Sequence, residues 1–261
     1  MVMKCFFIFV LIMFVWTVLI EPYTLTVNYG QVKDKELAGL RVVFVSDLHY
    51  KSYEKFRLLR DVKKIQSQNP DIVLFGGDFV NGHKKISSLN PSVIAKELGK
   101  IRSKYGSYAV LGNHDCWHDA YGIEKLLSEN NITVLKNSNK KIRNQFYIAG
   151  VEDLQTQNPD VNKALSGVGG PVILLTHTPD IFEDFVPESV NLTLAGHVHG
   201  GQVKLPKKGA IVAPSKFGTK YSEGFFNDMG RKMFVTRGIG TSILPIRFLC
   251  PPEIAVIEFV D

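Results

Sequence analysis

A short apolar segment ends in two histidines and a glycine turn within Leu192-Thr193-Leu194-Ala195-Gly196-His197-Val198-His199-Gly200-Gly201-Gln202. Alternate residues of an extended chain point the same way, so His197 and His199 can offer both imidazoles to one pocket. The flanking glycines allow the backbone and a bound group to approach closely. A lone His-x-His turn is equally compatible with two ordinary polar residues, so its meaning depends on the segments upstream.

Four upstream segments repeat this layout, because each is a short apolar run followed at once by polar residues. The runs and the polar residues after them are 40–45 with Asp47 and His49, 72–75 with Asp78, 108–111 with Asn113, His114 and Asp115, and 172–175 with His177. Helical spacing of apolar residues lies between the runs, over about 55–68, 92–104 and 122–130. Strands that alternate with helices predict an α/β fold, in which a ligand binds beyond the carboxyl ends of the strands.

The polar residues share a chemistry, since all are nitrogen or hard oxygen donors without a thiolate. The candidate metal ligands are Asp47, His49, Asp78, Asn113, His177, His197 and His199. Such donors suit Mn, Fe or Zn. Seven are too many for one catalytic ion with an open position, but they suit two ions that share a carboxylate. A pair of cations binds a phosphoryl group and activates a water near neutral pH.

Taken in chain order, the five sets of polar residues that follow the apolar runs resemble the motif series of the calcineurin-like metallophosphoesterases. The resemblance covers about residues 40–260 and implies a sandwich of two mixed β-sheets flanked by helices. It implies one ion held by Asp47, His49 and His199, a second held by Asn113, His177 and His197, and a bridging Asp78. It also implies that His114 stands near the phosphate and aids departure of the leaving group. Manganese is the favoured metal.

A narrower resemblance comes from Gly200-Gly201-Gln202 and from the run over 236–254. It points to a bacterial, membrane-associated phosphodiesterase branch of this family, some members of which are implicated in hydrolysing UDP-2,3-diacylglucosamine, a lipid A precursor. This implies a lipid-linked phosphoester substrate and no nucleic-acid partner. Two alternatives are a phosphodiesterase or nuclease on soluble substrates, which the positive charge allows, and a non-catalytic binding module. The complete set of donors argues against the module.

The N-terminus carries an uncharged apolar run over 5–20. As a helix it would rise roughly 24 Å, slightly short of a hydrocarbon core of about 30 Å, with Lys4 able to reach the interface. A cleaved signal peptide is the alternative, but the run is long and bulky and no small-x-small site follows it. The sequence therefore predicts a single-pass cell-membrane anchor over 1–20, a linker over 21–39 and a metallophosphoesterase domain over 40–261. Which side of the membrane the domain occupies is left open.

Composition agrees with one folded domain behind the anchor. The chain has 261 residues, of which 45% are hydrophobic and 21% charged, and a net charge of +6 that favours anionic partners. The three cysteines show no CxxC spacing, which argues against a thiolate zinc site and a disulfide framework. The apolar run over 243–246 is expected to pack in the core, with an acyl groove as the alternative. Oligomeric state is not predicted.

Overall fold

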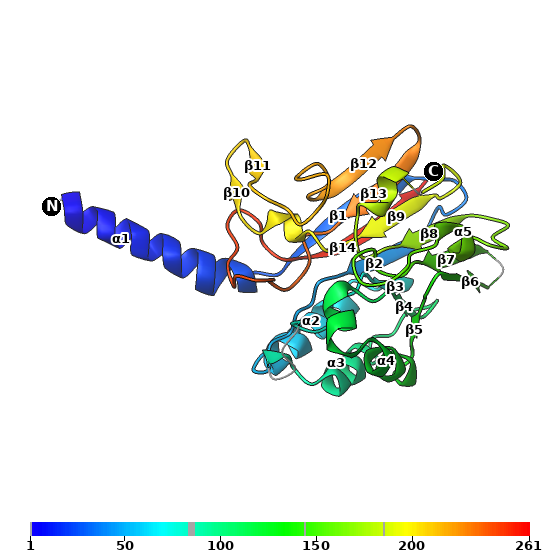
Figure 1. Cartoon of the computed structure of the whole chain (residues 1–261), viewed down its shortest axis with the longest axis horizontal. Coiled ribbons are helices and arrows are strands. Elements are labelled where there is room, and N and C mark those ends of the chain that lie inside the picture. The colour runs from blue at the N-terminus through cyan, green and yellow to red at the C-terminus, as the bar shows by residue number, and fades with distance from the viewer. Residues whose placement is uncertain (1, 83–86, 144, 185) are drawn as a thin grey trace.

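The computed structural model describes residues 2–82, 87–143, 145–184 and 186–261. Over these ranges, two six-stranded mixed β-sheets pack on each other, and helices cover their outer faces (Figure 1). The predicted fold class, an α/β sandwich of two mixed sheets flanked by helices, is therefore confirmed.

The first sheet combines a parallel unit, β2 to β5, with two strands from the chain ends. β14 pairs antiparallel with β2, and β1 pairs parallel with β14. In spatial order the strands are β1 (Thr26–Lys33), β14 (Glu253–Val260), β2 (Arg41–Val45), β3 (Ile72–Phe75), β4 (Ser107–Ala109) and β5 (Ile132–Val134).

The second sheet has a parallel centre, β13-β9-β8-β7, with an antiparallel strand at each edge. In spatial order the strands are β12 (Gly224–Asp228), β13 (Arg231–Val235), β9 (Leu192–Ala195), β8 (Val172–Leu175), β7 (Phe146–Gly150) and β6 (Ser138–Ile142). A small hairpin, β10 (Lys204–Leu205) and β11 (Gly209–Ala210), lies outside both sheets.

Both faces of the central strands are buried, which explains their unbroken apolar runs. In β2, Phe44 faces the second sheet, where it joins a core with Leu74 and Ile173. Val43 points to the opposite face, into a core that includes Leu58 of a covering helix. A third core lies on the outer face of the second sheet.

Three helices cover the outer face of the first sheet and two short ones lie against the second (Figure 1). They are α2 (Lys55–Gln66), α3 (Pro91–Leu98) and α4 (Asn113–Glu129) on the first sheet, and α5 (Val161–Ala164) and α6 (Ile181–Asp184) on the second. The helix α2 matches its predicted range of about 55–68 closely. The helix α3 ends at Leu98, before Gly99, rather than near the predicted 104. The helix α4 begins nine residues before the expected 122. The apolar pattern missed this start because the first turn carries polar site residues rather than an apolar stripe.

The sequence predicts a linker over 21–39, and the structure contradicts this for most of that range. Residues 26–33 form β1, which pairs with β14 from Thr26 to Lys33, and Glu21 and Pro22 are buried. An edge strand needs no continuous apolar run, since one side of it faces water. Its pattern of mixed polar and apolar residues is therefore hard to distinguish from a linker.

Over residues 2–23, the N-terminal helix projects away from the sandwich and contacts it near its base (Figure 1). It comprises α1 (Val2–Val15), a π-helical turn (Trp16–Ile20) and a 3₁₀ turn (Glu21–Tyr23). The Glu21 carboxylate accepts hydrogen bonds from Trp16 Nε1–H at 2.7 Å and from the Cys250 N–H at 2.5 Å. The Arg247 N–H donates to the Thr17 carbonyl at 3.0 Å. These bonds tie the helix base firmly to the domain.

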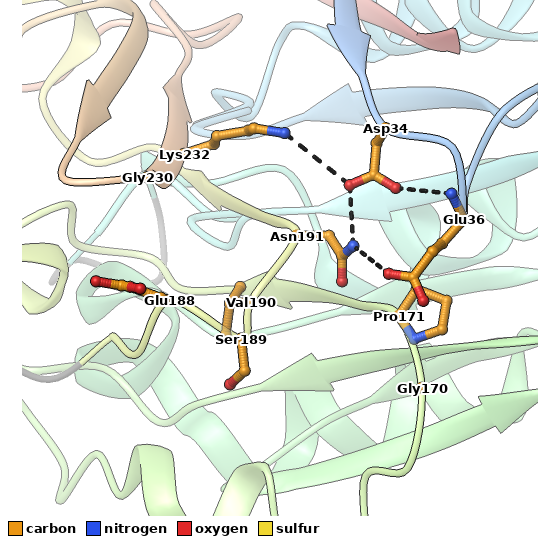
Figure 2. Close-up of a pocket in the computed structure, with 10 residues that line it drawn as sticks. All are labelled: Asp34, Glu36, Gly170, Pro171, Glu188, Ser189, Val190, Asn191, Gly230 and Lys232. Atoms are coloured by element: carbon orange, nitrogen blue, oxygen red, sulfur yellow. Dashed lines mark hydrogen bonds and ion pairs between the residues drawn. The ribbon is translucent and has the colours of Figure 1, made fainter. Parts of the chain in front are cut away.

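A polar hollow of about 360 Å³ lies at the end of the second sheet where β8 and β9 begin, away from the histidine turns (Figure 2). Asp34 accepts a hydrogen bond from Asn191 at 2.9 Å and lies 4.0 Å from the Lys232 ammonium. These polar groups satisfy one another and join the end of β1 to the second sheet. We assign this hollow a structural role.

Candidate metal centre

The loops that follow five strands converge at one edge of the sandwich and bring all eight predicted site residues together. The residues and their strands are Asp47 and His49 after β2, Asp78 after β3, Asn113 and His114 after β4, His177 after β8, and His197 and His199 after β9. Seven of them are buried, and His114 is half-buried. The carboxyl-end rule for α/β sheets therefore holds in both sheets.

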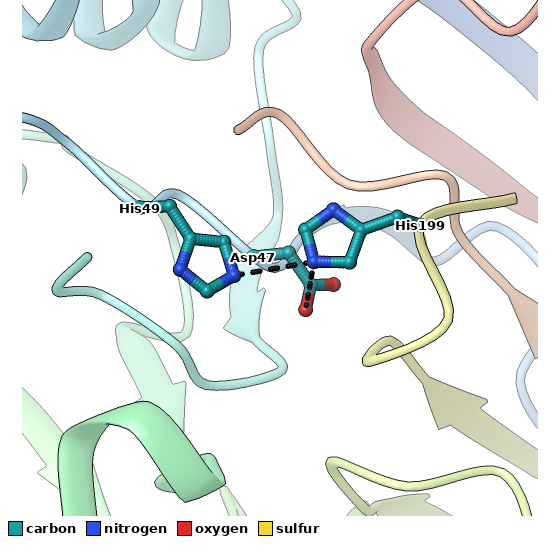
Figure 3. A group of neighbouring side chains, drawn as sticks. All are labelled: Asp47, His49 and His199. Carbon is teal, nitrogen blue, oxygen red and sulfur yellow. Dashed lines mark hydrogen bonds and ion pairs between the residues drawn. The ribbon is translucent and has the colours of Figure 1, made fainter. Parts of the chain in front are cut away.

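One group of donors consists of Asp47, His49 and His199 (Figure 3). His49 Nε2 lies 3.2 Å from His199 Nε2, and His199 Nε2 lies 3.5 Å from Asp47 Oδ1. The His197 N–H donates to both carboxylate oxygens of Asp47, at 3.0 and 3.1 Å, and so fixes that carboxylate.

The second group is built around His177. Its Nε2 lies 2.9 Å from Asn113 Oδ1 and 3.2 Å from His197 Nδ1. The far nitrogen of His197, Nε2, lies 2.9 Å from the amide of Gln155, which orients the ring. Gln155 has no sequence signal of its own.

Asp78 lies between the two groups. Its Oδ2 is 3.3 Å from His49 Nε2 and 3.3 Å from His177 Nε2. Its other oxygen, Oδ1, accepts the His114 N–H at 2.9 Å. One carboxylate oxygen at equal distance from two imidazoles is the arrangement expected of a bridging ligand.

The donor set fits divalent cations because its lone pairs face one another. His49 Nδ1 donates to the Val80 carbonyl at 3.1 Å, and His177 Nδ1 donates to the Gly76 carbonyl at 2.7 Å. A carbonyl can only accept, so in each neutral ring these bonds place the proton on Nδ1 and leave a lone pair on Nε2. Both lone pairs point toward the Asp78 carboxylate. A cation between them would convert this repulsion into coordination.

The pKa values of the metal-free groups show that burial disfavours charge on Asp47 and His49, whereas Asp78 favours a positive charge on His177. Burial raises the pKa of Asp47 to about 7 and lowers that of His49 to about 3. Burial also opposes protonation of His177, but the adjacent Asp78 outweighs it and raises the pKa of His177 to about 10. Without a metal, a proton on His177 therefore takes the place of the cation beside Asp78.

Five of the predicted ligands have left-handed backbone conformations. The φ angles are 54° at Asp47, 42° at His49, 55° at Asp78, 70° at His197 and 52° at His199. Each costs of order 1–3 kcal/mol, and such strain is typical of functional sites. The surrounding structure must therefore stabilise these loops.

Asp115 supplies part of this stabilisation, and the sequence analysis gave it no role. Its fully buried carboxylate accepts the N–H groups of Gly112 at 3.0 Å and of Asp78 and Phe79, both at 2.8 Å. It thus joins the Asp78 loop to the first turn of α4. An acidic residue three positions after a helix start is a capping signal that was available in the sequence.

Gly112 and Gly196, which precede Asn113 and His197, lie too close to neighbouring side chains to carry a side chain of their own. A Cβ on Gly112 would overlap the Asp78 carboxylate and the His177 ring, and one on Gly196 would overlap Ser46 and Asp47. The glycines in the motifs therefore have a packing function beside the site.

Arg247 was also missed by the sequence analysis. Its buried guanidinium donates to backbone carbonyls of Arg237 at 2.8 Å, Gly240 at 2.6 Å and Cys250 at 2.9 Å. The 237–240 segment in turn lies on the Asp47 loop, where the Gly240 N–H donates to the Asp47 carbonyl at 2.6 Å. No sequence pattern distinguishes this arginine from a surface one.

His114 lies beside both groups, and its ring forms a further set of donors with His49 and Asp78, within 4.8 Å of one another, that could hold a metal ion. Its ring centroid lies 4.5 Å from that of His49, and its Nε2 lies 3.5 Å from Ser242 Oγ at the rim of the centre. The neighbouring Cys116 has a pKa raised to about 11 by burial, so its thiol stays protonated near neutral pH.

Comparison with known proteins identifies the same family that the sequence motifs resemble. The calcineurin-like phosphoesterase family matches residues 40–201. The uncharacterized metallophosphoesterase YkuE of Bacillus subtilis (strain 168) is 31% identical over 251 residues, covering 91% of this chain and 86% of YkuE. Phosphodiesterase YaeI of Escherichia coli (strain K12) is 33% identical over 236 residues, covering 85% and 83%. A Danio rerio transmembrane protein with a metallophosphoesterase domain is 34% identical over 188 residues, covering 65% of this chain and 42% of that protein.

The similarity to YkuE and YaeI confirms the bacterial branch predicted from the motifs. Histidine and aspartate groups able to bind metal ions lie where those motifs converge. This chain belongs to the calcineurin-like phosphoesterase family, and it is a metal-dependent phosphoric ester hydrolase.

Proposed function

We propose that this enzyme is a membrane-anchored phosphodiesterase that holds two divalent ions. One ion is assigned to Asp47, His49 and His199, the other to Asn113, His177 and His197, and Asp78 bridges them. The observation that carries this proposal is the position of Asp78 Oδ2, 3.3 Å from the Nε2 atoms of both His49 and His177. Manganese is the favoured ion, with iron and zinc as alternatives.

The reaction divides between the ions and the protein. When bound, a pair of divalent cations neutralises phosphoryl oxygens and activates a water. His114 is not assigned to either ion, although its ring lies within reach of the donors of His49 and Asp78, and its backbone N–H donates to Asp78 Oδ1. An imidazole in this position can donate a proton to the leaving oxygen near neutral pH. We therefore assign His114 as the general acid.

The proposed substrate is amphipathic, with a nucleotide- or sugar-phosphate head and acyl tails. UDP-2,3-diacylglucosamine, from the lipid A pathway, is the specific candidate, taken from the resemblance to the bacterial branch. The span Met3–Tyr23, with 21 residues and a mean hydropathy of 2.5, is long and apolar enough to cross a membrane. A substrate embedded in the cell membrane would be concentrated near a domain held there.

Retention of the N-terminal helix, rather than cleavage as a signal peptide, is supported by its contacts. Trp16 and Thr17 are hydrogen-bonded to Glu21 and Arg247. Removal of residues 1–20 would leave the buried Glu21 carboxylate without its indole partner. We propose that these residues remain in the mature enzyme.

The test uses two proteins, the full chain and a deletion of residues 2–15 that keeps Trp16. Each is loaded with Mn, Fe or Zn and assayed with bis-p-nitrophenyl phosphate, p-nitrophenyl phosphate and UDP-2,3-diacylglucosamine in vesicles. We expect both proteins to prefer the diester over the monoester, and the deletion to lose activity selectively on the vesicle substrate.

Two results would contradict parts of this proposal. Rapid turnover of soluble diesters or nucleic acid by both proteins, with no hydrolysis of the lipid, would refute the lipid assignment. Equal activity of both proteins on the vesicle substrate would refute the role of the anchor.

A further inference from the structure

Six large apolar side chains are exposed on two segments near the metal centre. The exposed fractions are 98% at Ile243, 68% at Val212, 57% at Ile211, 56% at Leu244, 47% at Leu249 and 44% at Leu205. We name these six residues the apolar rim. The expectation that the run over 243–246 packs in the core is wrong for Ile243 and Leu244.

Hydrogen bonds join the two segments into one surface. The Lys204 N–H donates to the Phe248 carbonyl at 3.0 Å, and the Phe248 N–H donates to the Gln202 carbonyl at 2.9 Å. The Gln202 side chain donates to the Leu244 carbonyl at 3.2 Å and accepts the Ser242 N–H at 2.7 Å. The β10–β11 hairpin and the 242–249 loop therefore hold the apolar rim in a fixed arrangement.

Two rim residues have backbone conformations that disfavour their side chains. The φ angle is 62° at Ile243 and 53° at Leu249. A β-branched residue in the left-handed region is a true outlier, and strain of this kind clusters at functional sites. Here the strained backbone directs an isoleucine into solvent, and neither the strain nor the exposed side chain stabilises an isolated domain.

The apolar rim lies where the N-terminal helix leaves the domain. Arg247, within the 242–249 loop, donates its N–H to Thr17 at 3.0 Å, and Cys250 donates to Glu21 at 2.5 Å. Figure 1 shows the β10–β11 hairpin beside the base of the helix that begins with α1. Lys207 and Lys208, at the tip of that hairpin, are exposed and would attract anionic headgroups.

We propose that the apolar rim is a bilayer-contacting surface, which inserts at the lipid interface beside the anchor helix. This inference rests on the membrane-anchor part of the proposed function. Ser242, next to Ile243, lies 3.5 Å from His114 Nε2, so the rim borders the metal centre. Contact with the bilayer through this rim places the centre at headgroup level, where an amphipathic phosphoester presents its phosphate.

The test places an environment-sensitive fluorophore on single cysteines in the full chain. The probes are Ile243→Cys and Val212→Cys in a Cys5→Ser, Cys116→Ser background that retains the buried Cys250. The matched control is Met229→Cys, since Met229 is also apolar, 83% exposed and left-handed, with a φ of 48°, but lies in the distant β12–β13 turn. Native Cys5 in a Cys116→Ser chain reports on the anchor. Vesicles contain phosphatidylcholine and phosphatidylglycerol, with spin-labelled lipid as the quencher.

We expect quenching at positions 5, 243 and 212 and none at 229. Quenching at 5 without quenching at 243 and 212 overturns the bilayer surface and leaves the anchor intact. Quenching at 243 and 212 without quenching at 5 supports the surface and refutes the anchor. Shielding of 243 and 212 that lipid quenchers do not affect would identify a protein partner or a second copy, and would also overturn the proposal. None of these results depends on which substrate is hydrolysed.

Discussion

At the scale of single residues, replacing His114 and replacing a proposed metal ligand should affect metal content and kcat differently. We expect His114→Asn to retain its metal content and to lower kcat by about a hundredfold or more, because a general acid typically supplies that factor. The loss should be smaller for p-nitrophenolate than for an alkoxide leaving group, which needs a proton. Steady-state kinetics on both diesters, with metal analysis, make the comparison.

His118→Asn, on the same helix but outside the ligand cluster, is the matched control and should keep wild-type kcat. Equal losses for the good and poor leaving groups in His114→Asn, or loss of metal from that variant, would exclude the acid role.

His177 links the stability of the metal-free protein to pH. Its folded pKa is raised from 6.5 to about 10, so its contribution is fully present below about pH 6.5 and is lost as pH rises through about 10. We expect the Tm of chelated protein to fall over this window. Metal should remove most of the dependence, because it replaces the proton on Nε2. A Tm of chelated protein that rises over the window would contradict the assigned Asp78–His177 contact.

The sequence identified all eight converging residues because each follows an apolar strand at the carboxyl edge of a sheet. It offered a capping signal for Asp115, three residues after Gly112, but it did not show the bonds from Asp115 to the Asp78 loop, and it could not identify Arg247 as a support. These partners in other loops are backbone N–H and carbonyl groups, which leave no pattern of residue types. Left-handed conformations at Asp47 and His199 were equally invisible, since neither residue type requires them.

At the scale of elements, Asp115 connects the start of α4 to the loop after β3. We expect Asp115→Asn to lower the free energy of unfolding by about 1–3 kcal/mol, because an amide oxygen replaces a carboxylate and its NH₂ faces backbone donors. Metal affinity should fall with it, since the Asp78 loop loosens. Chemical denaturation and metal titration measure the two effects.

Asp119→Asn is the control for this substitution. Asp119 caps Gly122 within the same helix through an exposed hydrogen bond, so its loss should have a small effect. Equal destabilisation by the two variants would show that Asp115 has no special role.

Elements with a strong apolar pattern were predictable, and those with mixed patterns were not. The central strands β2, β3, β8 and β9 were expected within a residue or two of their observed bounds. By contrast, β1 and β12 mix exposed and partly buried residues and were missed, and the start of α4 was hidden by its polar residues.

At the scale of the whole molecule, hydrogen bonds connect the N-terminal helix to the candidate metal centre. Glu21 binds Cys250, whose thiol donates to the His199 carbonyl at 3.4 Å, and Arg247 binds both Thr17 and the segment lying on Asp47. A flexible linker would allow the domain to rotate freely above a membrane. The observed base instead fixes one face of the domain relative to the helix, which the sequence alone did not predict.

The most direct test of the two-ion centre is the metal-to-protein ratio of the wild type and of Asp78→Asn, measured after equilibrium dialysis together with diesterase activity. A shared carboxylate neutralises both ions, so we expect two ions per wild-type chain, weakened binding of both in the variant, and no turnover. His118→Asn should match the wild type. Two tightly bound ions and normal activity in Asp78→Asn would contradict the account.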